Sequence, residues 1–455
     1  MIIKHGLVVD PASGLSEHMD ILVKNGKITR IAPEISEDSE EILEAGGLVV
    51  GPGLIDTHVH FRDPGLTHKA DISTESRAAA AGGVTSIMDM PNTNPQTTTL
   101  DALNAKFDLL AEKCSVNYSC YFGATNNNYT EFDKLDKNRV CGIKLFMGSS
   151  TGNMLVDKMN SLLNIFNGTD LLIAAHCENH ETIKKNTEKY VKEYIEKYPH
   201  QYYHVHHETL PMGYHAKIRS IAACYESSEL AVRLARIADA RLHILHISTA
   251  RELSLFDNDI PLEEKRITAE ACVSHLLFDS SDYPELGARI KCNPSIKTKT
   301  NRDALRQAVN SNLIDVIATD HAPHLLKEKE GGPLKAMSGM PMIQFSLVSM
   351  LELVNEGIFT IEKVVEKMCH APAQIYNIHN RGFIRPGYQA DLVLVRPDAL
   401  WTVSADQILS KCGWSPLEGR TFEWKVEKTF ANGHLLYTDG QVDETYRGQE
   451  IYFER

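Results

Sequence analysis

Eight short segments rich in apolar and β-branched residues recur through the middle of the chain, separated by stretches with helical periodicity. The segments are 54–60, 84–90, 116–122, 140–146, 171–177, 242–248, 266–272 and 314–320. Alternation of strand and helix favours parallel strands joined by crossover helices, and eight such units are the number that closes a barrel. We therefore expect an α/β protein built on a (β/α)8 TIM-like barrel.

The two ends of the chain carry a different pattern, in which short alternating runs are joined by turns. Asn25-Gly26 divides the first end, and Asn432-Gly433 and Asp439-Gly440 divide the last. Such pairs favour tight hairpin turns. We expect residues 1–52 and 379–455 to form one small β-sandwich domain, with the barrel in residues 53–378 between them. Two separate hairpin modules are the alternative that the sequence leaves open.

Composition limits the partners and the compartment. The formal net charge of −13 argues against a nucleic-acid surface, which needs clustered cations, but leaves room for a small anionic ligand. The nine cysteines include no CxxC pair, and their odd number is untypical of a disulfide framework. Polar residues interrupt the first ten positions, and no later apolar run has the length of a membrane span. The sequence predicts a cytoplasmic protein that binds neither nucleic acid nor membrane.

Potential metal ligands fall at the ends of the predicted strands. His58 and His60 are two residues apart and share one face, while His176, His246 and Asp320 end or nearly end three later strands. A single strand histidine is usually a packed core or rim residue. Five such groups at the carboxyl ends of barrel strands would converge on one point, where barrel active sites are built. This pattern predicts a metal site.

Lys144, in the fourth predicted strand, is a further candidate. A strand lysine normally extends outward, and a free ammonium group binds no metal. An inward lysine beside two divalent cations can react with carbon dioxide to give an anionic carbamate that bridges them. No Asp or Glu occurs between Val140 and Val156 to offer a competing carboxylate.

Five motifs resemble those of the amidohydrolase superfamily, and of its dihydroorotase branch, in the expected order over nearly the whole chain. They are HVHFRDPG (58–65), MPNTNP (90–95), AAHCE (174–178), HILHIST (243–249) and ATDHAPH (318–324). The resemblance implies two zinc ions per subunit, one held by His58, His60 and Asp320 and the other by His176 and His246. Carboxylated Lys144 and a hydroxide would bridge the two ions.

The same resemblance implies a reaction, the reversible interconversion of N-carbamoyl-L-aspartate and L-dihydroorotate in de novo pyrimidine (UMP) biosynthesis. Asp320 would act as base and then as acid, taking a proton from the hydroxide and giving it to the ring nitrogen. Arg62 lies two residues beyond the HxH pair and offers a bidentate fork for the substrate carboxylate. A rim salt bridge with Asp63 is its alternative role. The resemblance adds the remaining substrate-binding residues, Asn92 and His324 at the carboxylate and Asn293 at the ring amides.

Four weaker signals complete the analysis, from two segments and two single residues. The histidine-rich stretch 200–208 is typical of a surface loop or a subunit contact, and the charged segment 325–341 is either a substrate lid or an exposed loop. Met342 departs from the family pattern, in which a glycine often follows the proline, and His321 has no predicted role. We expect a homodimer, and the sequence leaves open whether a transcarbamoylase is a partner.

Two rival interpretations remain. A dihydropyrimidinase (hydantoinase) or an allantoinase would share the barrel and the metals, but these branches generally lack an arginine at the position of Arg62. A non-catalytic homologue that acts as a scaffold for a transcarbamoylase would have lost metal ligands, which this chain retains.

Overall fold

The computed structural model of the chain describes residues 1–37, 40–148, 154–199 and 210–455. Each of the eight segments predicted to form a barrel strand contains one. The barrel strands are β6 (Leu54–Val59), β7 (Val84–Asp89), β8 (Asn117–Cys120) continued by β9 (Phe122–Gly123), β10 (Ile143–Phe146), β11 (Ile173–His176), β12 (Leu242–Ile244), β13 (Ile267–Cys272) and β14 (Val316–Ala318). All pair in parallel with their neighbours in chain order, as the barrel requires.

The barrel closes between its first and last strands. Val59 and His321 form a parallel bridge, and the His60 amide donates to the His321 carbonyl oxygen at 2.8 Å. The strand residues are buried on both faces of the strands, toward the barrel axis and toward the surrounding helices, and they include buried polar side chains as well as apolar ones. The expected (β/α)8 barrel is therefore confirmed.

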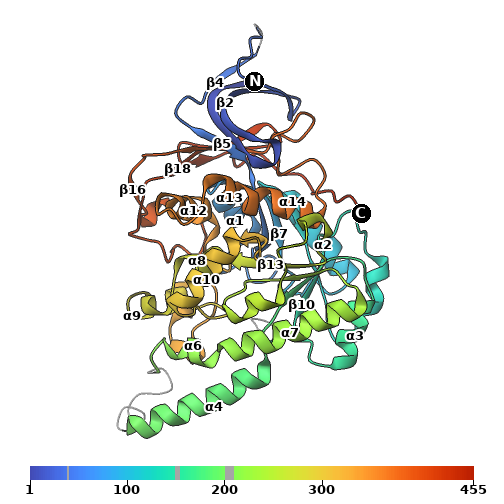
Figure 1. Cartoon of the computed structure of the whole chain (residues 1–455), viewed down its shortest axis with the longest axis vertical. Helices are drawn as coiled ribbons and strands as arrows, with labels where there is room; N and C mark the ends of the chain where they lie inside the picture. The colour runs from blue at the N-terminus through green and yellow to red at the C-terminus, as the bar shows by residue number, and fades with distance from the viewer. Residues whose placement is uncertain (38–39, 149–153, 200–209) are drawn as a thin grey trace.

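Helices surround this barrel (Figure 1). In the described residues they are α1 (Ile72–Ala81), α2 (Leu100–Lys113), α3 (Met159–Asn167), α4 (His180–Lys197), α6 (Tyr214–Ile218), α7 (Ile221–Ala238), α8 (Val273–Leu277), α9 (Tyr283–Leu286), α10 (Lys299–Asn310), α11 (Gly332–Lys335), α12 (Ser346–Asn355), α13 (Ile361–Val365) and α14 (Ala371–Tyr376). None of them has both the length and the apolar character of a membrane span.

Helix α1 shows how local sequence sets these boundaries. Asp71 is the N-cap and accepts from the Thr74 amide, while the Thr74 hydroxyl completes the capping box. A run of alanines carries the helix to Gly82, which ends it. Arg62 lies in the loop before α1. The capped start of α1 therefore fixes the end of this loop, which forms one edge of the site.

Both ends of the chain meet in one nine-stranded sheet. Its strands are β1 (Ile2–Asp10), β2 (Leu15–Lys24), β3 (Lys27–Ala32), β4 (Ile42–Glu44), β5 (Val49–Pro52), β15 (Leu392–Arg396), β18 (Lys425–Ala431), β19 (His434–Thr438) and β20 (Gln441–Val442). The two ends join where β5 pairs antiparallel with β15. A separate pair, β16 (Trp401–Thr402) and β17 (Thr421–Phe422), flanks it. The single sheet confirms a β-domain made from both termini and excludes two separate hairpin modules.

The three predicted turns lie where the sequence places them. Asn25-Gly26 joins β2 to β3, Asn432-Gly433 joins β18 to β19, and Asp439-Gly440 joins β19 to β20. All six residues have positive φ, as the favoured hairpin turns require.

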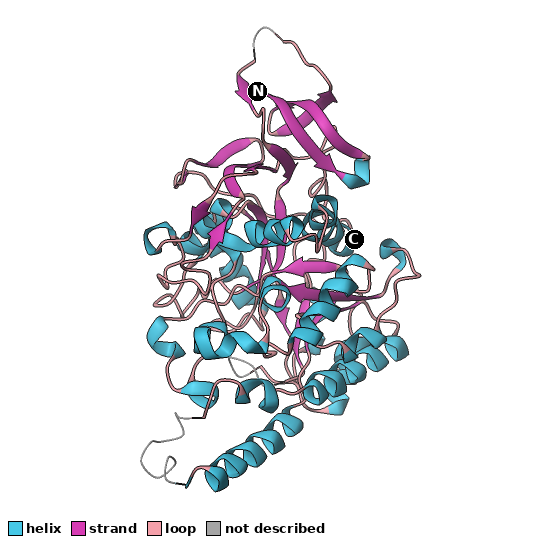
Figure 2. Ribbon diagram, turned by 60° about the vertical axis from the view of Figure 1, so that its left-hand side comes forward, coloured by secondary structure: helices cyan, strands magenta, loops and turns pink. Residues whose placement is uncertain are grey.

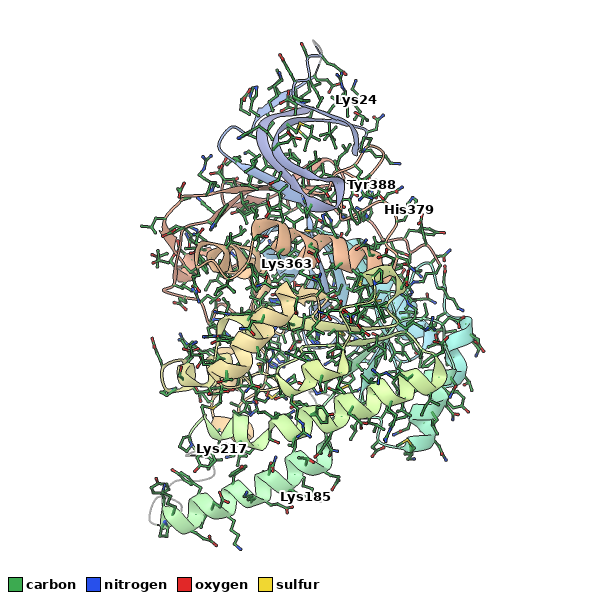
Figure 3. All side chains as sticks on the ribbon, in the orientation of Figure 1. Lys24, Lys185, Lys217, Lys363, His379 and Tyr388 are labelled. Atoms are coloured by element: carbon green, nitrogen blue, oxygen red, sulfur yellow. The ribbon has the colours of Figure 1, made fainter. Side chains whose placement is uncertain are left out.

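The β-domain lies at one end of the molecule and α4 at the other (Figures 1 and 2). Lys24 marks the β-domain end and Lys185 the α4 end in Figure 3. The histidine-rich stretch 200–208, predicted to be a surface loop or a subunit contact, lies outside the described residues.

Candidate active site

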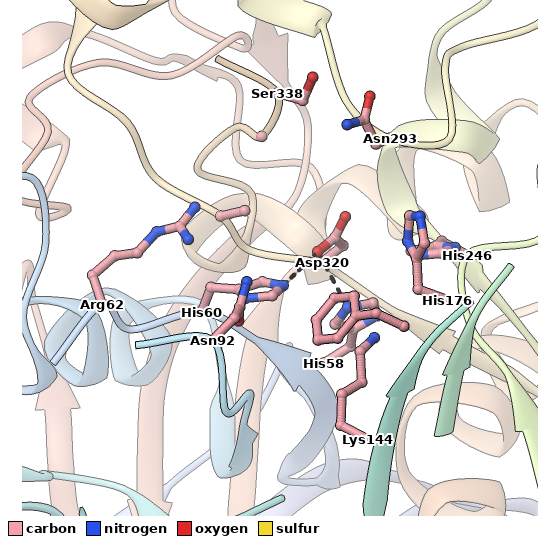
Figure 4. Close-up of a pocket in the computed structure, with 13 residues that line it drawn as sticks. His58, His60, Arg62, Asn92, Lys144, His176, His246, Asn293, Asp320 and Ser338 are labelled. Atoms are coloured by element: carbon pink, nitrogen blue, oxygen red, sulfur yellow. Dashed lines mark hydrogen bonds and ion pairs between the residues drawn. The ribbon is translucent and has the colours of Figure 1, made fainter. Parts of the chain in front are cut away.

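A pocket opens at the carboxyl ends of the barrel strands (Figure 4). It is lined by His58, His60, Arg62, Asn92, Lys144, Phe146, His176, His246, Asn293, Asp320, Ala322, Ser338 and Gly339. Nine of the ten residues that the sequence analysis assigned to metal, catalysis or substrate are therefore on its wall. The tenth, His324, lies behind it.

His58, His60 and Asp320 converge at one side of the pocket. Asp320 Oδ1 lies 3.2 Å from His58 Nε2 and 3.1 Å from His60 Nε2. The three ligand atoms lie close enough to surround one cation. Two imidazole nitrogens and one carboxylate oxygen are a donor set that suits zinc.

His176 and His246 meet at the other side. His176 Nδ1 lies 2.9 Å from His246 Nε2, and both rings are buried. The ring centroids of His246 and His58 are 5.4 Å apart, so the two sides of the site are contiguous. The four histidines and Asp320 therefore form one contiguous cluster.

The protonation states of these side chains are the ones that bind a metal ion. Burial lowers the pKa of His60 to about 4 and also lowers the pKa values of His176 and His246, so the three imidazoles are neutral at neutral pH. Burial alone would raise the pKa of Asp320, but its contacts with His58 and His60 outweigh this effect and lower that pKa. Neutral imidazole and ionised carboxylate are the forms that bind a metal.

Lys144 projects from β10 toward the same cluster. It is 1% exposed, and its Nζ lies 4.5 Å from the centre of the Phe146 ring. Burial lowers its pKa to about 8. Because this pKa is close to neutral pH, part of the Lys144 population is an uncharged amine. The uncharged amine is the nucleophile that carbamate formation needs. The donor set thus fits a metal site, with Lys144 beside it on the pocket wall.

Two of these residues, and Arg62, have an unusual backbone conformation. The φ angles of Arg62, His246 and Asp320 are 66°, 41° and 48°, in the left-handed region. The sequence predicted strands reaching residues 248 and 320, whereas β12 ends at Ile244 and β14 at Ala318. His246 and Asp320 therefore sit two residues past their strands. Each such conformation costs about 1–3 kcal/mol, which the surrounding contacts must offset.

Glu270, on β13, holds ligands from both sides of the cluster. Its side chain is fully buried and accepts from His58 Nδ1 at 2.8 Å, from the His246 amide at 3.1 Å and from the Thr57 hydroxyl at 3.3 Å. The bond to Nδ1 directs His58 Nε2 toward the metal side. The sequence analysis missed Glu270, whose only signal is an acid inside a buried strand.

Glu178 has a related role at His176. Its Oε2 lies 3.2 Å from His176 Nε2, and it pairs with Arg219. Burial would raise the pKa of Glu178, but Arg219 and His176 outweigh it and lower that pKa to about 2. The Glu178 carboxylate is therefore ionised, and it lies beside the ring whose Nδ1 faces His246.

Arg62 lies on the pocket wall and is 2% exposed. Its Nε donates to the Pro323 carbonyl oxygen at 3.1 Å, and its Nη2 lies 3.1 Å from His324 Nε2. Burial lowers its pKa to about 10, so it remains a cation at neutral pH. Asp63 pairs with Lys113 at 3.0 Å, so the alternative of a rim salt bridge between Arg62 and Asp63 is wrong.

The other predicted substrate-binding residues differ in their exposure to the pocket. Asn293 lines it, and its buried Oδ1 has no hydrogen-bond partner among the described residues. Asn92 also lines it, and its Oδ1 accepts from His60 Nδ1 at 2.8 Å. His324 is fully buried beside Arg62, so direct contact with substrate stays a prediction.

The segment 325–341 reaches the pocket through Ser338 and Gly339. Lys329 Nζ donates to the carbonyl oxygens of Lys291, Met337 and Gly339 at 3.1, 2.7 and 2.6 Å. These bonds tie the segment to the loop that carries Asn293. Whether it acts as a substrate lid stays a prediction.

Met342 and His321 have structural contacts. The amides of Met342 and Ile343 both donate to His321 Nδ1, at 3.1 and 3.2 Å. His321 Nε2 lies 2.8 Å from Glu75 Oε2 on α1. The Met342 amide is therefore engaged by His321 rather than directed into the pocket, and His321 joins the first and last units of the barrel.

Residues 49–436 match the amidohydrolase family. The chain belongs to this family. A dihydroorotase from Aquifex aeolicus (strain VF5) is 32% identical over 453 residues, covering 96% of this chain and 99% of the relative. An allantoinase from Bacillus velezensis is 30% identical over 434 residues, covering 94% of this chain and 92% of the relative.

Among solved structures, this amidohydrolase resembles an L-hydantoinase (dihydropyrimidinase) from Arthrobacter aurescens. The TM-score is 0.89 with 27% identity, and 97% of each chain is covered. The family match and this structural similarity establish both the family and the fold, a barrel with a β-domain. The relatives' names span three cyclic-amide reactions, so the amidohydrolase's own substrate must be argued from its pocket.

Proposed function

We propose that this amidohydrolase is a cyclic amide hydrolase and, more narrowly, a zinc-dependent dihydroorotase that interconverts N-carbamoyl-L-aspartate and L-dihydroorotate. The observation that carries the narrower proposal is the guanidinium group of Arg62 on the pocket wall. A desolvated cation beside the reaction centre favours a ring that carries a carboxylate. Dihydroorotate has such a group, whereas dihydrouracil, hydantoin and allantoin do not.

The assembled donor set supports catalysis rather than a scaffold role. His58, His60, His176, His246, Asp320 and Lys144 would hold two zinc ions, with Lys144 as a carbamate. When bound, the ions supply a water of lowered pKa and polarise the scissile carbonyl group. A non-catalytic homologue has no need to keep six such groups facing one pocket.

The remaining residues would bind the ring and move protons. Asp320, ionised and at the centre of the cluster, takes a proton from the attacking water and returns it to the leaving ring nitrogen. Asn293 Oδ1, which has no partner in the described residues, is free to accept from a ring N–H. Arg62 orients the ring through its carboxylate. In ring closure the same groups act in reverse.

The test compares ring opening of L-dihydroorotate with that of hydantoin, dihydrouracil and allantoin by the zinc-loaded protein. Arg62→Met and Arg62→Lys are measured beside the wild type. We expect turnover of dihydroorotate, with kcat/KM lowered by about 100-fold in Arg62→Met and less in Arg62→Lys, because a charge-assisted bidentate contact contributes about 1.5–3 kcal/mol.

Preference for an uncharged ring would instead assign the protein to the hydantoinase or allantoinase branch, which the solved L-hydantoinase and the B. velezensis relative represent. Failure to turn over any of the four substrates with two metals bound would favour the scaffold alternative. A homodimer, a transcarbamoylase partner and a cytoplasmic location stay predictions.

A further inference from the structure

A second buried cation lies behind Arg62. Lys69, in the loop between β6 and α1, is 4% exposed and is not part of the pocket wall. Its Nζ lies 3.1 Å from His324 Nδ1 and 3.3 Å from Glu328 Oε1. Burying an ammonium group costs free energy unless the group has hydrogen-bond partners. The groups that Lys69 contacts therefore indicate its role.

His324 is placed between two groups that can only donate hydrogen bonds. Lys69 faces its Nδ1, and Arg62 Nη2 faces its Nε2 at 3.1 Å. Burial and the neighbouring cations hold the pKa of His324 far below its usual range, so the ring is neutral. A neutral imidazole accepts at one nitrogen and donates at the other, and therefore cannot accept from both cations.

A third contact decides between the two tautomers. The Ser338 carbonyl oxygen lies 3.1 Å from His324 Nε2 and can only accept. With the proton on Nε2, Nδ1 accepts from Lys69 and Nε2 donates to Ser338. With the proton on Nδ1, the contact with Arg62 is satisfied, but the Nδ1–H faces the ammonium group and a lone pair faces the carbonyl oxygen. The acceptor nearest to that N–H, Glu328 Oε2, lies 3.7 Å from Nδ1, beyond hydrogen-bond distance. The Nε2–H tautomer is favoured, and Lys69 is the side chain that selects it.

This tautomer prepares the site for an anion. His324 Nε2–H does not accept from Arg62 Nη2, so this Nη2 keeps its N–H groups for a ligand. Two donors, Arg62 Nη2 and His324 Nε2, then stand 3.1 Å apart with no acceptor between them. A carboxylate group held by Arg62 can accept from both, with the Nε2–H shared between the ligand and the Ser338 carbonyl oxygen, whereas the other tautomer would present a lone pair to it.

We propose that Lys69 is a positioning residue for anionic substrates, which fixes His324 as a hydrogen-bond donor beside Arg62. Glu328 supports this role, because its Oε1 faces Lys69 while its Oε2 accepts from the Leu325 amide at 2.7 Å. The inference rests on the proposed function, since it concerns how the substrate carboxylate is recognised.

The kinetic test uses Lys69→Met, Lys69→Arg and a matched control, Lys113→Met, in zinc-loaded protein. Lys113 is also a lysine that contacts the Arg62–Asp63 turn, but it pairs with Asp63 and not with His324. We expect the KM for L-dihydroorotate to rise about tenfold in Lys69→Met with little change in kcat, as loss of uniform binding predicts. Lys69→Arg should recover much of the affinity, and Lys113→Met should match the wild type.

The tautomer itself is measured by long-range 15N–1H correlation spectra of histidine-labelled protein, with His324→Gln to assign the signal. We expect Nε2–H in the wild type and a gain of Nδ1–H in Lys69→Met. An unchanged KM in Lys69→Met, an equal effect in Lys113→Met, or Nδ1–H in the wild type would overturn the inference. If the wild type does not turn over dihydroorotate, the proposed function fails instead, and the spectra still decide the Lys69 contact.

Discussion

Replacing Glu270 with glutamine tests whether one buried carboxylate organises both metal positions. The substitution keeps the shape of the side chain, and its amide oxygen can still accept from His58 Nδ1 and the His246 amide. The substitution removes the charge and replaces the other oxygen, which accepts from the Thr57 hydroxyl, with an NH2 group that can donate to that hydroxyl. Burial would raise the pKa of Glu270, but His58 and His243 outweigh it and hold that pKa well below its usual range. The charge is therefore present in the folded protein and favours a proton on His58 Nδ1.

The expected loss follows from the 2.8 Å contact between Glu270 Oε1 and His58 Nδ1. Changing an orienting partner of a metal-bound histidine typically lowers affinity by about 10–100-fold. This corresponds to roughly 1.4–2.8 kcal/mol. Alanine would leave His58 Nδ1 and the His246 amide unpaired as well, so Glu270→Ala should also lower the free energy of unfolding by about 2–5 kcal/mol.

Zinc affinity is measured by competition with a chromophoric chelator, alongside metal content and thermal unfolding. Glu252→Gln is the matched control. Glu252 is equally buried, but it accepts from the hydroxyl groups of Ser228 and Thr249 and contacts no predicted ligand. Zinc affinity of Glu270→Gln within threefold of the wild type, or an equal loss in Glu252→Gln, would refute the reasoning.

Two further predictions concern the surroundings of the site. Gly65→Ala should lower the free energy of unfolding by at least ~2 kcal/mol in urea titrations, because φ is +81° and the new Cβ would lie 1.9 Å from the Asn94 carbonyl oxygen. Gly14→Ala, at a similar φ but in open space, is its control, and equal losses would exclude the clash as the cause. The lowered pKa of Glu178 contributes stability that is present above pH ~4.5 and is lost as the pH falls toward about 2. Chelator-treated wild type should therefore lose on the order of 3 kcal/mol more than Glu178→Gln over that range, and parallel pH profiles would contradict this.

The sequence predicts most of the site because its ligands fall at strand ends. In a closed barrel those ends meet, so the spacing of His58, His60, His176 and His246 along the chain carries three-dimensional information. The number of strands and the three hairpin turns follow for similar local reasons. The exact ends of the strands cannot be predicted in this way. Strand β12 ends at Ile244, before the left-handed backbone conformation of His246, and no local sequence signal indicates that conformation.

The supporting residues could not be found in this way. Glu270 acts on His58 across 212 positions of sequence, and Lys69 acts on His324 across 255. A single acid in a buried strand, or a single lysine in a loop, has no periodicity or motif that indicates its partner. His324 shows the same limit, because its motif places it near the site but not behind Arg62.

The nine-stranded sheet built from both chain ends has a consequence for synthesis on the ribosome. Strand β5 ends at Pro52, but its partner β15 begins only at Leu392, after the whole barrel has been made. At a translation rate of about 5–20 residues per second, one edge of the sheet formed by the first strands stays unpaired for some tens of seconds. During that interval β1 to β5 are open to pairing with other chains, a hazard of exposed strands. The barrel can therefore be complete before the β-domain is, although the first strands of the β-domain emerge before the barrel does.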